Sequence, residues 1–184
     1  MALPRTFVSF SSADIGSYHM MCAWKGQEHI DFNFYDLQLE EAIDSTNEQY
    51  IKRVCRAKLN RAGTYVLLVG NDTRFKTTYV KWEAEVAIEN ECRLIAVNLD
   101  KYRRINYVTC PSWFSDVGAI FVPFSPQIVA YALENWRAPS PRAKNWEYND
   151  SQYQTLGYVL DGDTATRPPK QNPFGGGNRP SWAK

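Results

Sequence analysis

The segment "TTYVKWEAEVAIENE", residues 77–91, has the periodicity of an amphipathic helix whose apolar face carries a carboxylate. At about 100° per residue, Glu83 falls near the middle of the arc that contains Tyr79 and Val86. Burying an unpaired carboxylate is costly, so Glu83 must have a partner, lie at the rim of a cavity, or have a raised pKa. Each of these makes it a site candidate. The alternative is a plain contact with an arginine or a backbone amide at the core edge.

Strand and helix patterns alternate around this segment. Apolar runs predict strands over residues 5–10, 29–36, 64–70, 93–99 and 119–124, and helical patterns fall at 14–25, 48–61, 77–91 and 125–138. Asp14 is expected to cap the first helix. Because strands that alternate with helices form parallel sheets, the sequence predicts a flavodoxin-like α/β fold. Its five-stranded parallel sheet would have helices on both faces.

In such sheets, ligands bind beyond the carboxyl ends of the strands, where the winding reverses. In a flavodoxin-like order this place lies next to the first and third strands. We therefore expect a ligand site at Ser11–Asp14 and Gly70–Thr73.

The composition changes at Pro139, after which Pro, Gly and Asn are frequent and periodicity is lost. We predict a domain over residues 1–138 and an irregular C-terminal extension of unknown role over 139–184. Residues 153–160 are expected to form one short element docked on the core, with Trp146 and Trp182 as further anchors.

Several function classes are disfavoured by composition. The 21 basic and 20 acidic residues form no basic block, so nucleic acid is not an expected partner. No apolar run is long enough for a signal peptide or a membrane span, so we expect a cytoplasmic protein. The scattered cysteines favour buried free thiols over a metal site, and the sequence contains neither a dinucleotide-binding nor a P-loop glycine motif.

The motifs "FVSFSSAD", "FYDLQLEEAIDSTNEQYIK", "YVLLVGNDT" and "YVKWEAEVAIE", followed by "CRLIAVNLD", resemble in their order and spacing bacterial TIR-like domains, particularly those of Thoeris antiphage systems. The resemblance spans residues 5–138. Catalytic TIR domains have a W-x-x-x-E pattern whose glutamate is essential for NAD+ cleavage, and it falls here on Tyr79 and Glu83.

The same resemblance implies that the nucleotide site is formed by Phe10, Ser11, Ser12 and Asp36 together with Tyr79. Serines stand where many eukaryotic relatives have basic residues. We therefore expect the pyrophosphate to be bound by hydroxyls and by backbone N–H groups near Asp14.

The resemblance implies an NAD+ glycohydrolase or ADP-ribosyl cyclase. Nicotinamide departs as a neutral base from a cationic pyridinium, so no general acid is needed, and one ionised carboxylate can stabilise the ribosyl oxocarbenium ion. NAD+ is then a substrate and no cofactor is expected. A cyclised nucleotide would act as a signal on a separate effector protein, and self-association is expected on activation.

Two other functions remain open. Many TIR domains recruit partners without catalysis, and the acidic stretch "LQLEEAIDSTN", with Glu40, Glu41 and Asp44, would then be a recognition surface. The second alternative is a flavodoxin-type binder of a small ligand.

Overall fold

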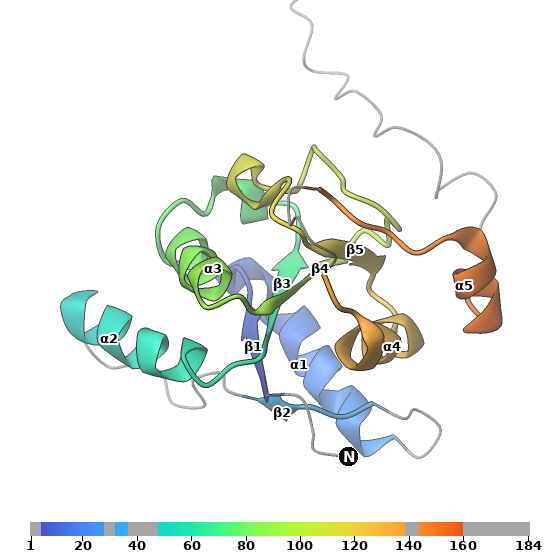
Figure 1. Ribbon diagram of the computed structural model, residues 1–184, viewed down its shortest axis with the longest axis horizontal. Coiled ribbons are helices and arrows are strands. Elements are labelled where there is room, and N and C mark those ends of the chain that lie inside the picture. The colour runs from blue at the N-terminus through green and yellow to red at the C-terminus, as the bar shows by residue number, and fades with distance from the viewer. Residues whose placement is uncertain (1–4, 28–31, 37–47, 139–143, 160–184) are drawn as a thin grey trace, which may run out of the picture.

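The computed structural model describes residues 5–27, 32–36, 48–138 and 144–159 (Figure 1). Its centre is a parallel sheet in the order β2-β1-β3-β4-β5. The strands are β1 (Arg5–Ser9), β2 (Tyr35–Asp36), β3 (Thr64–Val69), β4 (Arg93–Asn98) and β5 (Ile120–Pro123). The predicted parallel α/β architecture is confirmed. The winding reverses between β1 and β3, as predicted, because β2 and β3 flank β1 on opposite sides.

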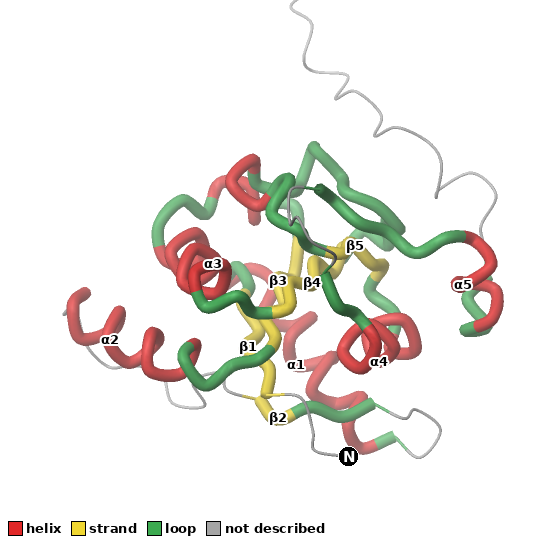
Figure 2. The backbone as a smooth tube through the Cα atoms, viewed as in Figure 1, coloured by secondary structure: helices red, strands yellow, loops and turns green. Residues whose placement is uncertain are grey.

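Helices cover both faces of the sheet (Figure 2). The helices α2 (Glu48–Leu59) and α3 (Tyr79–Glu89) cover one face, and α1 (Ile15–Ala23) and α4 (Pro126–Asn135) cover the other. A hydrophobic core lies on each face of the sheet, and alternate residues of β3 pack into the two cores. Leu67 packs on the α3 side and Val66 on the α4 side. Since both faces are buried, β3 reads as an uninterrupted apolar run in the sequence.

The second strand is shorter than predicted within the described residues. The pattern over residues 29–36 predicts a full strand, but in the described part, residues 32–36, pairing is confined to Tyr35 and Asp36 opposite Arg5 and Thr6 of β1. Residues 29–31 of the predicted strand lie outside the described residues. The aromatic residues that precede β2 are instead buried by packing: Phe32 lies edge-on to Trp24 at 5.4 Å between ring centroids.

Asp14 occupies the N-cap position of α1, as predicted, but its side chain makes no capping hydrogen bond. A short 3₁₀ turn at Ser12–Asp14 precedes α1, and its first turn is capped by Ser11, whose hydroxyl accepts a hydrogen bond from the Ala13 N–H. The Asp14 carboxylate lies instead over the end of β3.

Residues 144–159 pack on the core and contain one short helix, as expected, although the helix begins at Asp150 rather than at Tyr153. Trp146 bridges to Ile120 of β5, and its backbone exchanges hydrogen bonds with Ala119 and Phe121 at 2.9 and 2.8 Å. The helix α5 (Asp150–Thr155) begins at a capping box formed by Asn149 and Gln152. Its residue Tyr153 is fully buried.

The acidic loop with Glu40, Glu41 and Asp44, and Trp182, lie outside the described residues. In the part of the chain that the structure describes, no helix is both long and apolar enough to cross a bilayer. All four cysteines are free thiols, as predicted, and Cys22 is the one that is only half-buried.

Candidate functional site

A pocket of about 370 Å³ opens beyond the carboxyl end of β1, where it meets the start of α3. Its lining comes from two short segments, Phe10, Ser11 and Ser12 on one side and Phe75, Lys76, Thr77, Thr78, Tyr79 and Val80 on the other. Four of the residues predicted for the nucleotide site are thus brought together. Ser11 and Ser12 agree with the switch point predicted from the strand order, but none of residues 70–73 lines the pocket, whose other side begins at Phe75.

Aromatic rings stand at this pocket with much of their surface exposed. Phe75 is 64% exposed and Tyr79 is 44% exposed. Tyr79 therefore does not belong to the buried arc of α3, which is formed by Val80, Ala84 and neighbouring residues. Exposed rings beside a pocket are available to stack on a flat ligand.

Glu83 is partly buried and is not itself among the residues that line this pocket. It follows Tyr79 by one helical turn, and helical side chains lean towards the N-terminus of their helix, so its carboxylate is directed towards the pocket end of α3. The hydroxyl of Ser9 donates a hydrogen bond to Oε2 of Glu83 at 2.6 Å. Ser9 directly precedes Phe10, so the carboxylate contacts the residue next to the pocket wall.

Burial raises the pKa of Glu83 to about 7, and the hydrogen bond from Ser9 opposes this rise. Within the described residues, Glu83 forms no ion pair that would compensate its charge. Of the possibilities raised by its place on an apolar face, the structure therefore favours desolvation beside a cavity over pairing at the core edge.

Two residues that line the pocket, Ser11 and Lys76, are joined through Asp72. The Ser11 hydroxyl donates to Oδ2 of Asp72 at 2.8 Å, and the Lys76 ammonium lies 3.1 Å from the same oxygen. Lys76 is thus a cation in the pocket wall. No sequence motif singles out Lys76, although it lies only three residues beyond the predicted 70–73 edge.

Gly70 and Asp14 approach each other closely at the end of β3. A Cβ atom at position 70 would lie 2.3 Å from the Asp14 carboxylate oxygens, so this contact requires glycine. Burial, and secondly the charge of Asp72, raises the pKa of the Asp14 carboxyl group. Asp14 is therefore a structural neighbour of Asp72, and it is not among the residues that line the pocket.

Asp36 does not line the pocket. Its Oδ2 atom accepts a hydrogen bond from the Tyr18 hydroxyl at 2.8 Å and lies 4.0 Å from the Lys25 ammonium. Tyr18 stacks in turn on Phe10, with ring centroids 4.6 Å apart. Asp36 thus contacts the pocket wall only indirectly, through the ring that supports Phe10.

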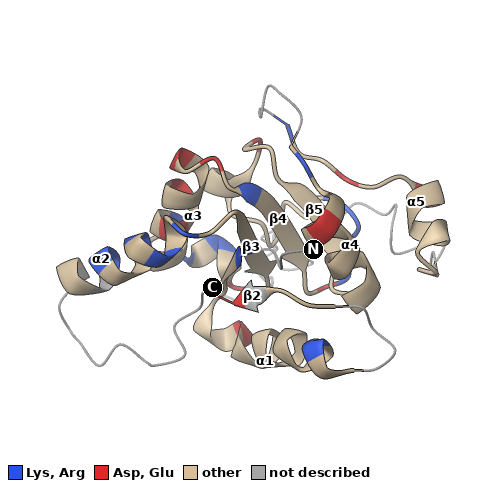
Figure 3. Cartoon of the chain, turned by 60° about the horizontal axis from the view of Figure 1, so that its bottom comes forward, with Lys and Arg blue, Asp and Glu red and all other residues tan. Residues whose placement is uncertain are grey.

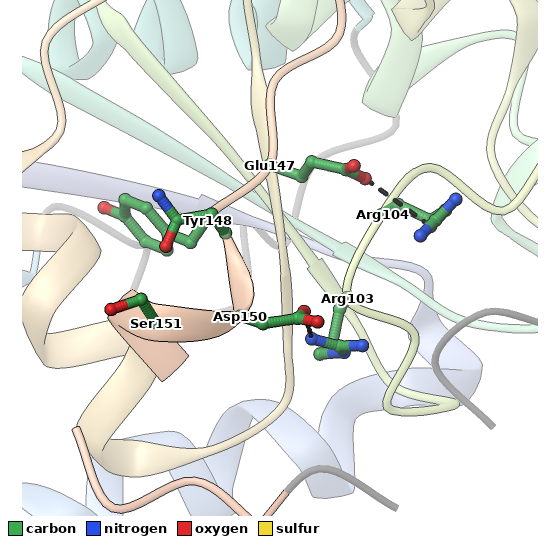
Figure 4. Close-up of a pocket in the computed structure, with 7 residues that line it drawn as sticks. Arg103, Arg104, Glu147, Tyr148, Asp150 and Ser151 are labelled. Atoms are coloured by element: carbon green, nitrogen blue, oxygen red, sulfur yellow. Dashed lines mark hydrogen bonds and ion pairs between the residues drawn. The ribbon is translucent and has the colours of Figure 1, made fainter. Parts of the chain in front are cut away.

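A second pocket, of about 430 Å³, lies at the seam between the loop after β4 and residues 147–151 (Figure 4). Arg103 pairs there with Asp150, and Arg104 lies 3.6 Å from Glu147. Each arginine is paired with an acidic residue of the segment 147–151, so these charges stabilise the contact between the two segments. Of the two pockets, the one at β1 and α3 is the better candidate for chemistry because a carboxylate of raised pKa lies beside it.

Comparison with known proteins gives one family match. The family model described as Thoeris protein ThsB, TIR-like domain, matches residues 7–104. This span covers the pocket at β1 and α3 together with Glu83, and it ends before β5, α4 and α5. No curated protein matches the chain.

Proposed function

The chain belongs to the family of Thoeris ThsB TIR-like domains, an antiphage-defence family, and from this premise we propose that it cleaves NAD+ to release nicotinamide. The observation that supports this most directly is Glu83, a desolvated carboxylate beside the pocket and without a cationic partner among the described residues. The sequence position of Glu83 is that of the glutamate in the family pattern. The position of Tyr79 at the pocket rim is consistent with stacking on the nicotinamide or adenine ring.

The proposed chemistry needs one negative charge. As the C–N bond to nicotinamide lengthens, positive charge grows on the ribose, and an ionised Glu83 interacts more strongly with this transition state than with the ground state. Desolvation strengthens the interaction because few water dipoles screen it. Capture of the cation by water gives ADP-ribose, whereas capture by a group of the same molecule gives a cyclic nucleotide, the product we favour for signalling to a separate effector.

The proposal is tested by incubating the purified protein with NAD+ and measuring nicotinamide by chromatography. The measurement is repeated at rising protein concentration, because we propose that self-association activates the enzyme. Release of nicotinamide above a no-protein control supports the function, and mass spectrometry of the other product distinguishes hydrolysis from cyclisation. Intact NAD+ at every concentration, with a candidate infection trigger added, would favour the non-catalytic interaction module.

The pH dependence of this reaction follows from the raised pKa of Glu83. Only the ionised carboxylate stabilises the cation, so kcat/KM is expected to rise with pH through about 7 and to become level above it. An unperturbed glutamate would give a level profile across this range, since its pKa lies near 4.5. Initial rates at low NAD+ between pH 5 and 9 measure the midpoint.

Lys76 is expected to bind the diphosphate of NAD+, since it is the cation that lines the pocket. Lys76→Met should raise KM about tenfold and leave kcat nearly unchanged, because a phosphate contact is made equally in the ground and transition states. Lys81→Met is the matched control: Lys81 lies on the exposed side of α3, 3.7 Å from Glu85. Equal KM values for the two variants would exclude this role for Lys76.

A further inference from the structure

Ser9 is the last residue of β1, and it is almost completely buried, with 1% of its surface exposed. Its hydroxyl contacts only one of the two oxygens of Glu83, donating to Oε2 at 2.6 Å. Within the described residues, Oε1 accepts no comparable hydrogen bond. A rigid strand end therefore fixes one oxygen of a helical carboxylate, while the other remains available to a ligand.

We propose that Ser9 is a positioning residue for Glu83. The Ser9 hydroxyl holds Oε2 of Glu83, so that Oε1 of the same carboxylate faces the ribose in the pocket. The identity of the ligand, a ribose, rests on the proposed function. The contact between Ser9 and Glu83 is independent of that function. Three features support the proposal. Ser9 comes from β1, whose pairing with β3 fixes its position. The O–O distance is that of a strong hydrogen bond to a charged acceptor. Ser9 also adjoins Phe10 of the pocket wall.

Apart from burial, the hydrogen bond from Ser9 is the main influence on the pKa of Glu83, because the other groups near it carry no charge. From α2, Cys55 lies close enough for its thiol pKa to be raised by the Glu83 charge as well as by burial, to about 11. From β3, the fully buried Tyr65 has a pKa raised well above its ordinary value, mainly by burial and secondly by Glu83. Both groups are neutral near pH 7. The basic side chains of α2 (Figure 3) include Arg56, which faces the Trp82 ring at 5.9 Å.

The decisive variant is Ser9→Ala, which removes the hydroxyl with almost no change of volume. Since a donor to the carboxylate favours its ionised form, its loss should raise the pKa of Glu83 by about one unit or more. The pKa is read from the carboxyl ¹³C shift of labelled glutamate, assigned by difference from Glu83→Gln. Thr64→Val is the control, because it removes a buried hydroxyl at the far end of the β1–β3 pairing.

In activity measurements, Ser9→Ala should raise the midpoint of the pH profile of kcat/KM by the same amount as it raises the pKa of Glu83. It should also lower kcat about tenfold above that midpoint, with a smaller change in KM, because the oriented oxygen acts mainly in the transition state. Ser9→Thr, which keeps a hydroxyl, should restore part of the kcat. An unchanged Glu83 titration in Ser9→Ala would overturn the proposal. If the wild-type protein releases no nicotinamide, the function fails, and the NMR titration alone still decides whether Ser9 holds Glu83.

Discussion

Replacing Glu83 with glutamine is expected to abolish nicotinamide release while the fold remains intact. Glutamine has nearly the same shape as glutamate and can still accept a hydrogen bond from Ser9, but it carries no charge to face the ribosyl cation. We expect kcat to fall on the order of a thousandfold or more. The measurement is nicotinamide release at saturating NAD+, compared with Glu85→Gln. Glu85 is exposed on the opposite side of α3, so this control should retain full activity.

The same substitution should stabilise the protein above neutral pH. Because the folded-state pKa of Glu83, about 7, exceeds its ordinary value of 4.5, the folded protein binds a proton that the unfolded chain releases. Stability from this group is complete below about pH 4.5 and is lost as pH rises to 7. Glutamine has no such loss, so Glu83→Gln should gain about 1 to 3 kcal/mol at pH 8 and little at pH 4.5. Thermal melts at the two pH values measure this, and equal gains would contradict the assignment.

Ending the chain at Ala138 is expected to unfold the protein or to make it insoluble. The cut removes Tyr153, a fully buried aromatic residue, and Trp146, whose backbone pairs with Ala119 and Phe121. It also leaves the buried guanidinium of Arg103 without Asp150. Loss of a single buried aromatic side chain typically costs about 3 to 5 kcal/mol, a large part of the stability of a small domain.

The control for this truncation is a chain that ends at Val159, which keeps α5 and all the described contacts of the segment. We expect its melting temperature to match that of the whole chain. Soluble yield and thermal unfolding compare the two lengths. A folded chain of residues 1–138 with an unchanged melting temperature would show that α5 contributes nothing to the core.

The sheet was predictable because β3, β4 and β5 are buried on both faces and therefore appear as apolar runs bounded by polar turns. The start of β2 at Tyr35, within the described residues, was not predictable, since Phe32 alternates with polar residues as a strand would but is buried by packing in the core. The docking of α5 was only partly predictable. Its burial depends on one residue, Tyr153, within a short polar helix, and six residues are too few for a helical period to emerge.

The candidate site was predictable where it depends on strand order and helical position. Periodicity placed Glu83 on the inner side of α3, topology placed Ser11 at the switch point, and the family resemblance added Phe10. The contacts of Ser9 and Lys76 were not predictable, because they depend on how β1 and the loop before α3 approach each other in space. Asp36 was expected in the pocket, but its contacts with Tyr18 and Lys25 place it behind the wall.

Residues 144–146 run beside β5 and occupy backbone groups that a neighbouring molecule would need in order to extend the sheet. Strand-to-strand growth of a filament is therefore blocked on this side of each subunit. On the opposite border, the described part of β2 offers two residues. On the β5 side, a cooperative assembly of this protein must accordingly be joined through helix and loop surfaces, and its interfaces there should be sensitive to side-chain charge and shape.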